Sequence, residues 1–146
     1  MNTLLSQTAE YALRIMIFLT ELKDESVTAA QISKATRVPV GYTVKVLQQL
    51  SRAKFVKGQR GRTGGFVLDC DPAQILLLQI VTTIDPLERI TSCPLDRADH
   101  KNGLCPLHKQ IDCAIGGLRK TLSSMSLHDV VKSSVGLTLC QDKLVE

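Results

Sequence analysis

The residues of this chain that are best suited to bind a transition metal are cysteines and a histidine in its second half. Cys93, Cys105, His108 and Cys113 lie within 21 residues of one another. Thiolate and imidazole ligands suit zinc or an iron–sulfur cluster. If Pro106 opens a helix, His108 lies about 4.5 Å from Cys105 along its axis and Cys113 about 12 Å, at roughly 1.5 Å per residue. The best local set is therefore Cys93, Cys105 and His108, which is one ligand short of four.

The other cysteines show no pattern of this kind. The chain has five cysteines, an odd number at irregular spacings. No stretch approaches the roughly 18 apolar residues that span a bilayer, and the first residues lack the basic segment and cleavage site of a signal peptide. A cytoplasmic protein with reduced thiols is therefore expected. We interpret Cys70, Cys113 and Cys140 as buried, free cysteines.

A second kind of chemistry is indicated by the charge of the first half. Residues 26–68 contain no Asp or Glu but eight Lys and Arg, a local charge of +8. The formal charge of the whole chain is +4, so the remaining residues sum to −4. Charge segregated in this way is typical of a surface that binds a polyanion, and duplex DNA is the partner we expect. The basic residues are Lys34, Arg37, Lys45, Arg52, Lys54, Lys57, Arg60 and Arg62.

Three helices are expected to position these basic side chains. Ser6 can cap a first helix that runs to about Leu22. Thr28 can cap a short second helix over residues 29–35, and Pro39 suits the first position of a third helix. Two short helices joined by a brief turn, with the second more basic, are typical of a helix-turn-helix.

The third helix has a polar face without acidic residues. At about 100° per residue, this face lies opposite Val46, Leu47 and Leu50. Gln can read adenine edges, and Lys and Arg bind guanine or phosphate, so we predict a recognition helix rather than an ordinary solvated face. The residues of the face are Gly41, Lys45, Gln48, Gln49 and Arg52.

A glycine-rich hairpin follows this helix. Residues 55–57 and 65–68 are expected to form two short strands, and the glycines between them permit a tight turn. Arg60 and Arg62 at the tip suit a narrow minor groove. The hairpin is therefore interpreted as the wing of a winged helix-turn-helix. The expected DNA-binding residues are Thr28, Pro39, Gly41, Tyr42, Thr43, Lys45, Gln48, Gln49, Arg52, Arg60, Gly61, Arg62 and Thr63.

The next segments are expected to connect the wing to a second helical region. Pro72 suits the start of a largely buried helix that ends near Asp85. Residues 87–103 keep no helical period, and a connection of this length is usually functional or disordered. A last short helix is predicted at residues 126–131.

A long helix from Cys105 to Met125 is predicted by one apolar stripe between Leu107 and Leu122. The adjacent glycines 116 and 117 are its weak point. The stripe continues further than one small core needs, which favours a homodimer that reads two halves of a palindromic operator. The fold class is thus mainly α, with a DNA-binding domain at 1–85, a cysteine-bearing sensor loop at 86–104, a dimerisation helix and short terminal helix at 105–134, and a tail at 135–146.

Over roughly residues 1–133 the chain resembles the IscR/NsrR-type bacterial winged-helix regulators. The resemblance rests on TAEYALRIM, VPVGYTVKVLQQLSRAKFV and RGRTGGFVL, followed by a cysteine-bearing loop before a long helix. It implies a cytoplasmic, homodimeric transcription factor, usually a repressor. It also implies a [2Fe–2S] or [4Fe–4S] iron–sulfur cluster whose redox state, loss or nitrosylation alters DNA binding.

The same resemblance assigns cluster ligands. The family pattern has three loop cysteines and, in some members, a histidine three residues after the last. Cys93, Cys105 and His108 match this pattern, but the middle cysteine is missing. In some members an acidic residue of the first helix completes the cluster from the partner subunit, and Glu10 occupies that position. The candidates for the missing ligand are Glu10 in trans, Cys113 and His100.

Two alternatives stay open. The same DNA-binding dimer can carry zinc or no metal and respond to a metabolite or a partner protein. A small thiol enzyme that uses Cys105 and His108 is a different class, but the sequence has no Cys-x-x-Cys motif and no phosphate-binding loop. We therefore expect a DNA-binding regulator and not an enzyme.

Overall fold

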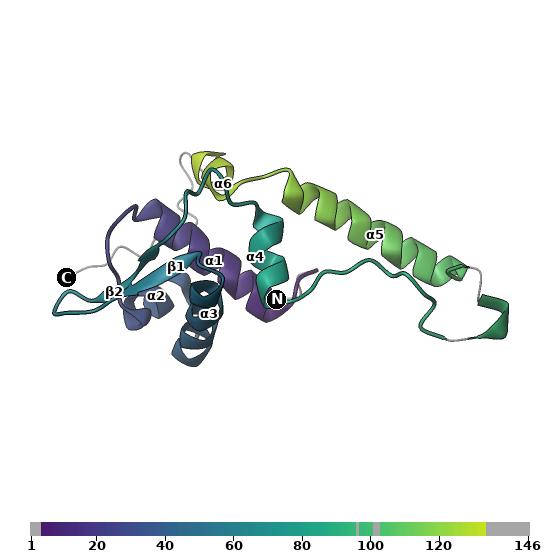
Figure 1. The fold of residues 1–146 in the computed structure, drawn as a ribbon, viewed down its shortest axis with the longest axis horizontal. Helices are drawn as coiled ribbons and strands as arrows, with labels where there is room; N and C mark the ends of the chain where they lie inside the picture. Colours follow the sequence, from purple (N-terminus) through teal and green to yellow (C-terminus); the bar gives the residue numbers. More distant parts are fainter. Residues whose placement is uncertain (1–3, 96, 101–102, 134–146) are drawn as a thin grey trace.

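The computed structural model describes residues 4–95, 97–100 and 103–133, so Cys140 and the tail 135–146 lie outside the described residues. Within them, six α-helices and one two-stranded antiparallel sheet confirm the predicted mainly α, winged helix-turn-helix class (Figure 1). None of the described helices is long and apolar enough to cross a membrane. The elements are α1 (Gln7–Glu21), α2 (Ala29–Thr36), α3 (Val40–Arg52), β1 (Val56–Gln59), β2 (Gly65–Leu68), α4 (Leu77–Ile84), the 3-10 turn η1 (Ala98–His100), α5 (Pro106–Ser123) and α6 (Leu127–Ser133).

The helix-turn-helix consists of α2 and α3, and local contacts define the start of α2. The Thr28 hydroxyl accepts a hydrogen bond from Gln31 N, and the Gln31 side chain accepts one from Thr28 N, which forms a capping box. The helix ends at Arg37, whose φ of 56° lies in the left-handed region. Pro39 has a ψ of 138° and precedes α3, so the helix begins at Val40, one residue later than predicted.

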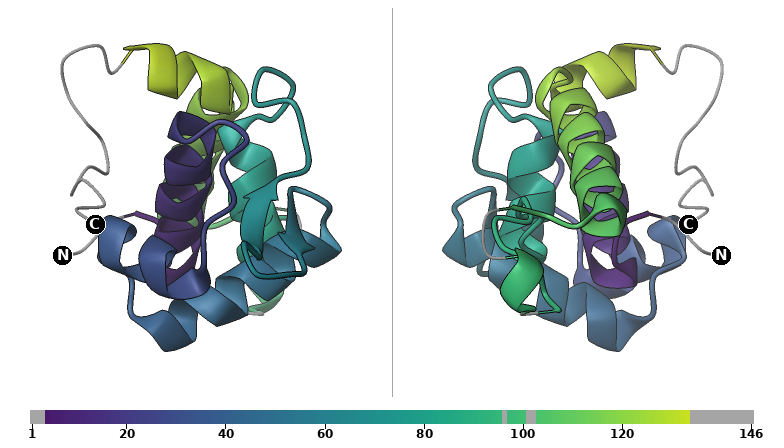
Figure 2. Two further views of the ribbon diagram at one scale, coloured as in Figure 1. Left: turned by 90° about the vertical axis from the view of Figure 1, so that its left-hand side faces the viewer. Right: turned by 90° about the vertical axis from the view of Figure 1, so that its right-hand side faces the viewer.

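The main core lies between α1 and the helix-turn-helix. Ile15 and Leu19 of α1 are buried in one cluster with Leu47 and Leu50 of α3. Each aliphatic side chain buried in this way contributes roughly 1.5–3 kcal/mol. The helix α6 also packs on α1 and adds Leu127 to the same core (Figure 2). The last described helix of the chain therefore completes the core that packs beneath the helix-turn-helix.

The wing consists of β1 and β2, which pair antiparallel. The first strand was expected at 55–57; it begins one residue later and ends two residues later. The second strand also pairs with the segment before α2, since Phe66 N donates to Val27 O at 2.7 Å. Gly65 permits this close approach, because a Cβ there would lie 2.5 Å from the Val27 oxygen. The wing is thus anchored to the helix-turn-helix at its base.

The fourth helix is shorter than predicted. It begins at Leu77 and not at Pro72, because the Asp71 carboxylate and carbonyl hold a turn in place of the first helical residues. The chain is then extended at Leu76, which forms a β-bridge with Ser126. This pairing joins segments 50 residues apart in the sequence, and it removes the residues before Leu77 from the helix.

The long helix α5 lies beside the connection that follows α4. In Figure 1 this connection runs outward from the core, and α5 returns along it toward α6. The helix is unbroken through Gly116 and Gly117, so these glycines do not interrupt it. The short turn η1 is the one helical feature of the described connection.

The apolar stripe of α5 changes in exposure along its length. Leu122 is buried in a second cluster with Ala9 and Val81. At the other end, Leu107 is 62% exposed and Ile111 is 42% exposed. The inner end of the stripe therefore packs on the core, and the outer end leaves large apolar side chains uncovered in the single chain.

Candidate metal centre and nucleic-acid interface

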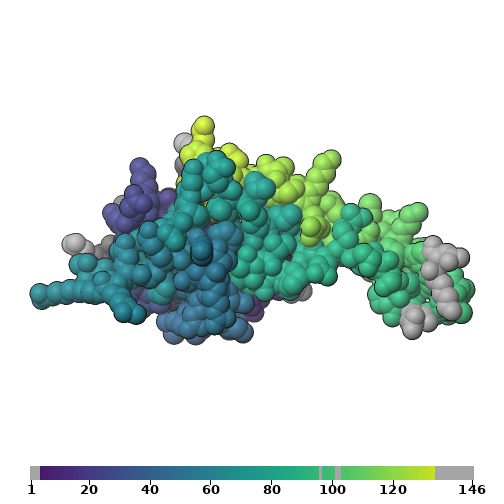
Figure 3. All heavy atoms as spheres, viewed as in Figure 1, coloured from purple at the N-terminus to yellow at the C-terminus, as the bar shows by residue number. Residues whose placement is uncertain are grey.

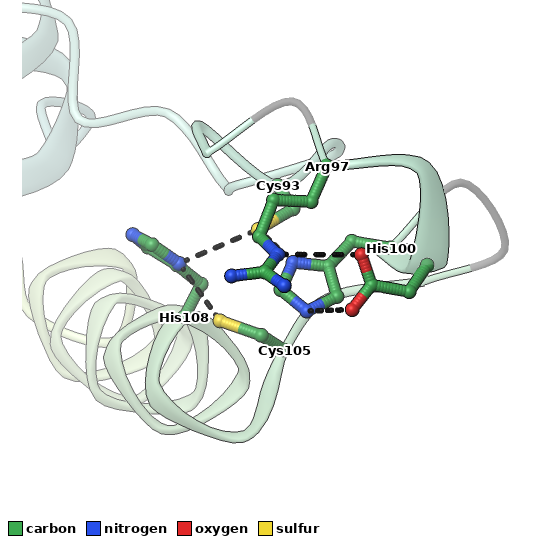
Figure 4. Close-up of polar contacts among 6 residues, drawn as sticks. Cys93, Arg97, His100, Cys105 and His108 are labelled. Carbon is green, nitrogen blue, oxygen red and sulfur yellow. Dashed lines mark hydrogen bonds and ion pairs between the residues drawn. The ribbon is translucent and has the colours of Figure 1, made fainter.

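Cys93, Cys105 and His108 come together at the outer end of α5 (Figure 4). Cys105 directly precedes the helix and His108 lies in its first turn, while Cys93 reaches them from the connection. The His108 Nδ1 atom is 3.0 Å from Cys105 Sγ and 3.6 Å from Cys93 Sγ. The three ligand atoms all lie within 4.8 Å of one another. The fold thus assembles the local set that the sequence predicted.

The surroundings of Cys93 favour its thiolate. A hydrogen bond from the backbone of Leu95 is the largest cause that lowers the pKa of Cys93, to about 6. Burial opposes this shift, and hydrogen bonds from the Cys105 backbone and the His100 side chain add to it. The thiolate is the form of cysteine that binds a metal. The hydrogen bonds at this site therefore favour the form of Cys93 that can bind a metal.

The other predicted ligands lie apart from this group. Cys113 is exposed on α5, so its predicted burial is wrong, and it does not belong to the three-residue group. Cys70 is half-buried, and its thiol donates to Phe55 O at 3.4 Å; burial raises the pKa of Cys70, as expected for an inert thiol. Glu10 pairs with Arg14 on α1, with 2.7 Å between Oε1 and Nε.

A two-part clamp fastens the first part of the connection to α5. Arg89 makes a bidentate pair with Asp112, with 2.6 Å and 2.5 Å between nitrogen and oxygen. About two turns further along the helix, Arg119 donates to the carbonyl of Leu87. Bidentate guanidinium–carboxylate pairs fix direction as well as distance. The clamp therefore directs the chain so that Cys93, four residues after Arg89, reaches the start of α5.

One feature of the site was missed from the sequence, and the structure gives one candidate ligand a position. The triplet Cys-Pro-Leu occurs twice, at 93–95 and at 105–107, so each cysteine of the group opens the same short motif. His100, one of three candidates for a missing ligand, has its Nδ1 atom 3.3 Å from Cys93 Sγ. The repeated triplet is a signal that could have singled out these two cysteines without a family pattern.

The predicted polar face of α3 lies on the surface. Gly41, Lys45, Gln48 and Arg52 are exposed, and Gln49 is half-buried. A helix face that carries amides and cations and no acidic side chain can read base edges and contact phosphates. Pro39 and Tyr42, also predicted to bind DNA, are exposed at the start of the same helix.

Val44 is a surface residue of this helix that the sequence prediction omitted. It is 42% exposed and lies one turn before Gln48. Apolar side chains on a recognition helix can contact the methyl group of thymine. At about 100° per residue Val44 lies between Leu47 of the apolar face and Gln48 of the polar face. Its apolar type therefore gave no reason to expect an exposed side chain.

Thr43 and Thr28 have structural roles that the prediction did not assign. Thr43 is fully buried, and its hydroxyl donates to Val38 O at 3.3 Å and Pro39 O at 3.2 Å. The side chain therefore has a structural role here, and its expected contact with DNA stays a prediction. Thr28 is exposed, but its hydroxyl is engaged in the cap of α2.

The tip of the wing is the most projecting basic part of the chain. Arg60, Gly61, Arg62 and Thr63 are all exposed, and Gly61 has a φ of 120°, which favours glycine. The wing projects at the left of Figure 3, whereas the cysteine-bearing connection lies at the right. The two candidate sites are thus at opposite ends of one chain.

The start of α3 is held against α1 by aromatic contacts. The rings of Tyr42 and Tyr11 meet edge to face with 5.6 Å between their centroids. The Arg14 guanidinium lies 5.8 Å from the Tyr11 centroid, and the same Arg14 pairs with Glu10. The start of α3 is therefore linked to Glu10 through the two rings and the Arg14 guanidinium.

A helix-turn-helix with a basic wing, followed by a long helix whose outer end gathers thiols and an imidazole, defines a winged-helix transcriptional regulator. A family model described as an iron-dependent transcriptional regulator, Rrf2, matches residues 5–133. The chain belongs to the Rrf2 family. Members of this family are DNA-binding regulators and not enzymes.

Solved structures share this fold. The chain is similar to IscR of T. potens, with a TM-score of 0.73 and 18% identity over 96% of this chain and 94% of that chain. It is also similar to CymR (YrzC), the global cysteine regulator of B. subtilis, with a TM-score of 0.70 and 22% identity over 91% and 98% of the two chains. The CymR of Staphylococcus aureus in its oxidized form gives a TM-score of 0.68 and 17% identity over 89% and 97%.

Proposed function

We propose that the protein is a homodimeric repressor that binds a palindromic operator in the bacterial cytoplasm under the control of an iron–sulfur cluster. Cys93, Cys105 and His108 hold the cluster. The observation that carries this proposal is the convergence of these three donors to within 4.8 Å, in a chain of a family described as iron-dependent. When bound, the cluster supplies sensitivity to redox state, iron supply or nitric oxide.

The residues present fit such a group. Two thiols and an imidazole are its usual ligand types, and backbone N–H groups already stabilise the Cys93 thiolate. The connection brings Cys93 to a helix whose N-cap residue and first turn carry the other two donors. The chain orients these donors. Both cysteines are only 9% exposed, which limits the access of water and oxidants.

In this proposal residues 1–85 bind DNA, residues 86–104 sense the signal and residues 105–134 pair the subunits. The face of α3 enters the major groove, and Arg60 and Arg62 follow the neighbouring minor groove. The eight basic residues without a nearby acid in the sequence support this placement. The contacts come from Pro39, Gly41, Tyr42, Lys45, Gln48, Gln49, Arg52, Arg60, Gly61, Arg62 and Thr63, with Thr28 capping α2 beside them.

Purification under anaerobic conditions tests the cofactor. We expect a coloured protein with iron and sulfide, and a Cys105→Ala variant that is colourless and no longer changes its operator binding with the signal. A colourless, iron-free anaerobic protein would contradict the cluster and leave DNA binding intact.

The triple variant Lys45→Ala, Gln48→Ala, Arg60→Ala tests the proposed DNA-binding surface of α3 and the wing, which we call the reading head. We expect operator binding to fall and its salt dependence to weaken, since each lost phosphate contact lowers the slope by about 1. Unchanged binding and an unchanged slope would refute the placement of the reading head.

A second candidate is the same dimer with a single zinc ion in place of the cluster. It is favoured by the 3.6 Å between Cys93 Sγ and His108 Nδ1, which matches the edge of about 3.5 Å in a tetrahedral site with bonds of about 2.3 Å to sulfur and 2.0 Å to nitrogen. The 3.0 Å between Cys105 Sγ and His108 Nδ1 is shorter than such an edge. Elemental analysis by mass spectrometry separates the two, because zinc at one equivalent without iron fits only this candidate.

A further inference from the structure

We propose that His100 is the fourth ligand of the metal centre, so that one chain supplies a complete set of two thiolates and two imidazoles. The inference rests on the proposed metal site and adds to it a ligand that the family pattern does not contain. A set of this kind takes a borderline-soft centre, either one tetrahedral Zn²⁺ or an iron–sulfur core with mixed sulfur and nitrogen ligands.

The first support is the position of His100. Its Nδ1 atom lies 3.3 Å from Cys93 Sγ, a distance between those that join His108 to the two cysteines. Its side chain is only 22% exposed. In Figure 4 the His100 ring lies beside Cys93. Cys93 therefore contacts an imidazole on each side.

The second support is the other nitrogen of the same ring. Histidines that bind a metal usually direct their second ring nitrogen to a carboxylate or carbonyl, which fixes the ring. His100 Nε2 lies 3.9 Å from Asp99 Oδ2, and Asp99 in turn pairs with Arg97 at 3.3 Å. The carboxylate is thus placed on the side of the ring away from Cys93, and Nδ1 is left to face the thiol.

The third support is that the competing ligands are engaged or remote. Glu10 would have to leave its ion pair with Arg14, which measures 2.7 Å, before it could reach a metal in the partner subunit. Cys113 is exposed and lies two helical turns from Cys105 on α5. His100 also lies outside the group of three, but it is in contact with Cys93, and joining the group requires neither the loss of the Glu10–Arg14 ion pair nor a second chain.

Titration of the metal-free, full-length protein with Co²⁺ tests the assignment, because tetrahedral Co²⁺ absorbs far more strongly than octahedral Co²⁺ and reports each thiolate by charge transfer. We expect one Co²⁺ per chain with a tetrahedral spectrum. His100→Ala should weaken binding by about 10–100-fold or more, given that even outer-shell partners cost this much, and should reduce the tetrahedral bands. Glu10→Gln and Cys113→Ser should retain the spectrum and affinity of the unaltered protein.

His100→Cys is the matched variant that keeps a ligand at this position. It should restore tetrahedral binding and raise the charge-transfer intensity from that of two thiolates to that of three. Circular dichroism verifies that each variant is folded. The inference is overturned if His100→Ala retains the tetrahedral spectrum at unchanged affinity, if His100→Cys adds no charge transfer, or if Glu10→Gln loses binding as His100→Ala should.

Operator binding, measured with and without metal, separates this inference from the proposed function. If the Co²⁺ spectra follow the expectation but metal leaves operator affinity unchanged, the ligand assignment stands and metal control of DNA binding fails. If metal controls operator binding and His100→Ala retains the full spectrum, the proposed function stands and His100 is not a ligand. Iron reconstitution of the same variants then distinguishes an iron–sulfur core from a single ion.

Discussion

At the scale of single residues, Thr43 separates a structural from a DNA-reading role on one helix. Its buried hydroxyl bonds two carbonyls at the start of α3, whereas Gln48 is exposed on the polar face. We expect Thr43→Val to lower the free energy of unfolding by about 1 kcal/mol, the usual net value of a lost hydrogen bond, with operator affinity nearly unchanged. Gln48→Ala should lower operator affinity and leave the free energy of unfolding nearly unchanged. Urea unfolding and fluorescence anisotropy with operator DNA measure the two effects, and a Thr43→Val protein of full stability and lost affinity would contradict this account.

Asp112 gives the clamp a pH dependence. Its hydrogen bonds from Arg89 hold the pKa of this carboxyl below its ordinary value. Because the folded pKa is the lower one, the stabilisation is fully present above the pKa of the unfolded chain, about 4, and is lost as the pH falls through the folded pKa. We expect Asp112→Asn to lower the melting temperature at pH 7 and to have progressively less effect below about pH 4.

Asp69→Asn is the matched control for this prediction. Asp69 pairs with Lys57 at 3.0 Å, but both side chains are largely exposed, so the variant should change the melting temperature little. Equal effects of the two variants at pH 7 would show that the Arg89–Asp112 pair has no special structural role.

At the scale of elements, sequence patterns predicted what is local and missed what is long-range. The starts of α1 and α2 follow from Ser6 and Thr28, whose side chains cap the helices as expected. The start of α4 was wrong, because Leu76 is held extended by a partner 50 residues away. No local period contains that information. The site divides in the same way: spacing predicted the pairing of Cys105 with His108, whereas the approach of His100 depends on how the connection folds back.

The adjacent glycines of α5 respond differently to the same change. A Cβ at Gly117 meets nothing within 4 Å, whereas at Gly116 it would lie 2.9 Å from Arg89 Nη1. Gly117→Ala should therefore stabilise the protein by about 0.5–1 kcal/mol. Gly116→Ala must displace the guanidinium from Asp112, so its gain should be cancelled or reversed. Urea unfolding of the two variants checks this, and equal stabilisation would mean that Arg89 moves aside at no cost.

At the scale of the whole molecule, the reading head and the metal group lie far apart in one chain (Figure 3). A signal at Cys93 and Cys105 therefore has no direct contact with α3 of the same chain. In the dimer that we propose, a second chain would provide a shorter path, since pairing through α5 would bring the loop of one subunit toward the α3 and wing of the other. The contacts of Tyr42 with Tyr11, beside Arg14 and Glu10, would carry such a displacement to the recognition helix.

This arrangement makes dimerisation a testable requirement. Leu107 and Ile111 are large exposed apolar residues at the outer end of α5, and burying them against a second copy would remove them from water. We expect Ile111→Glu to yield monomers in sedimentation equilibrium and to lose about 10²–10⁴-fold in affinity for a two-half-site operator, the usual effect of lost bivalency. Affinity for a single half-site should be unchanged. Gln110→Glu introduces the same charge one residue away, at another exposed position, and should remain dimeric. A dimeric Ile111→Glu protein would exclude this face as the interface, and the path from metal to DNA would then have to run within one chain.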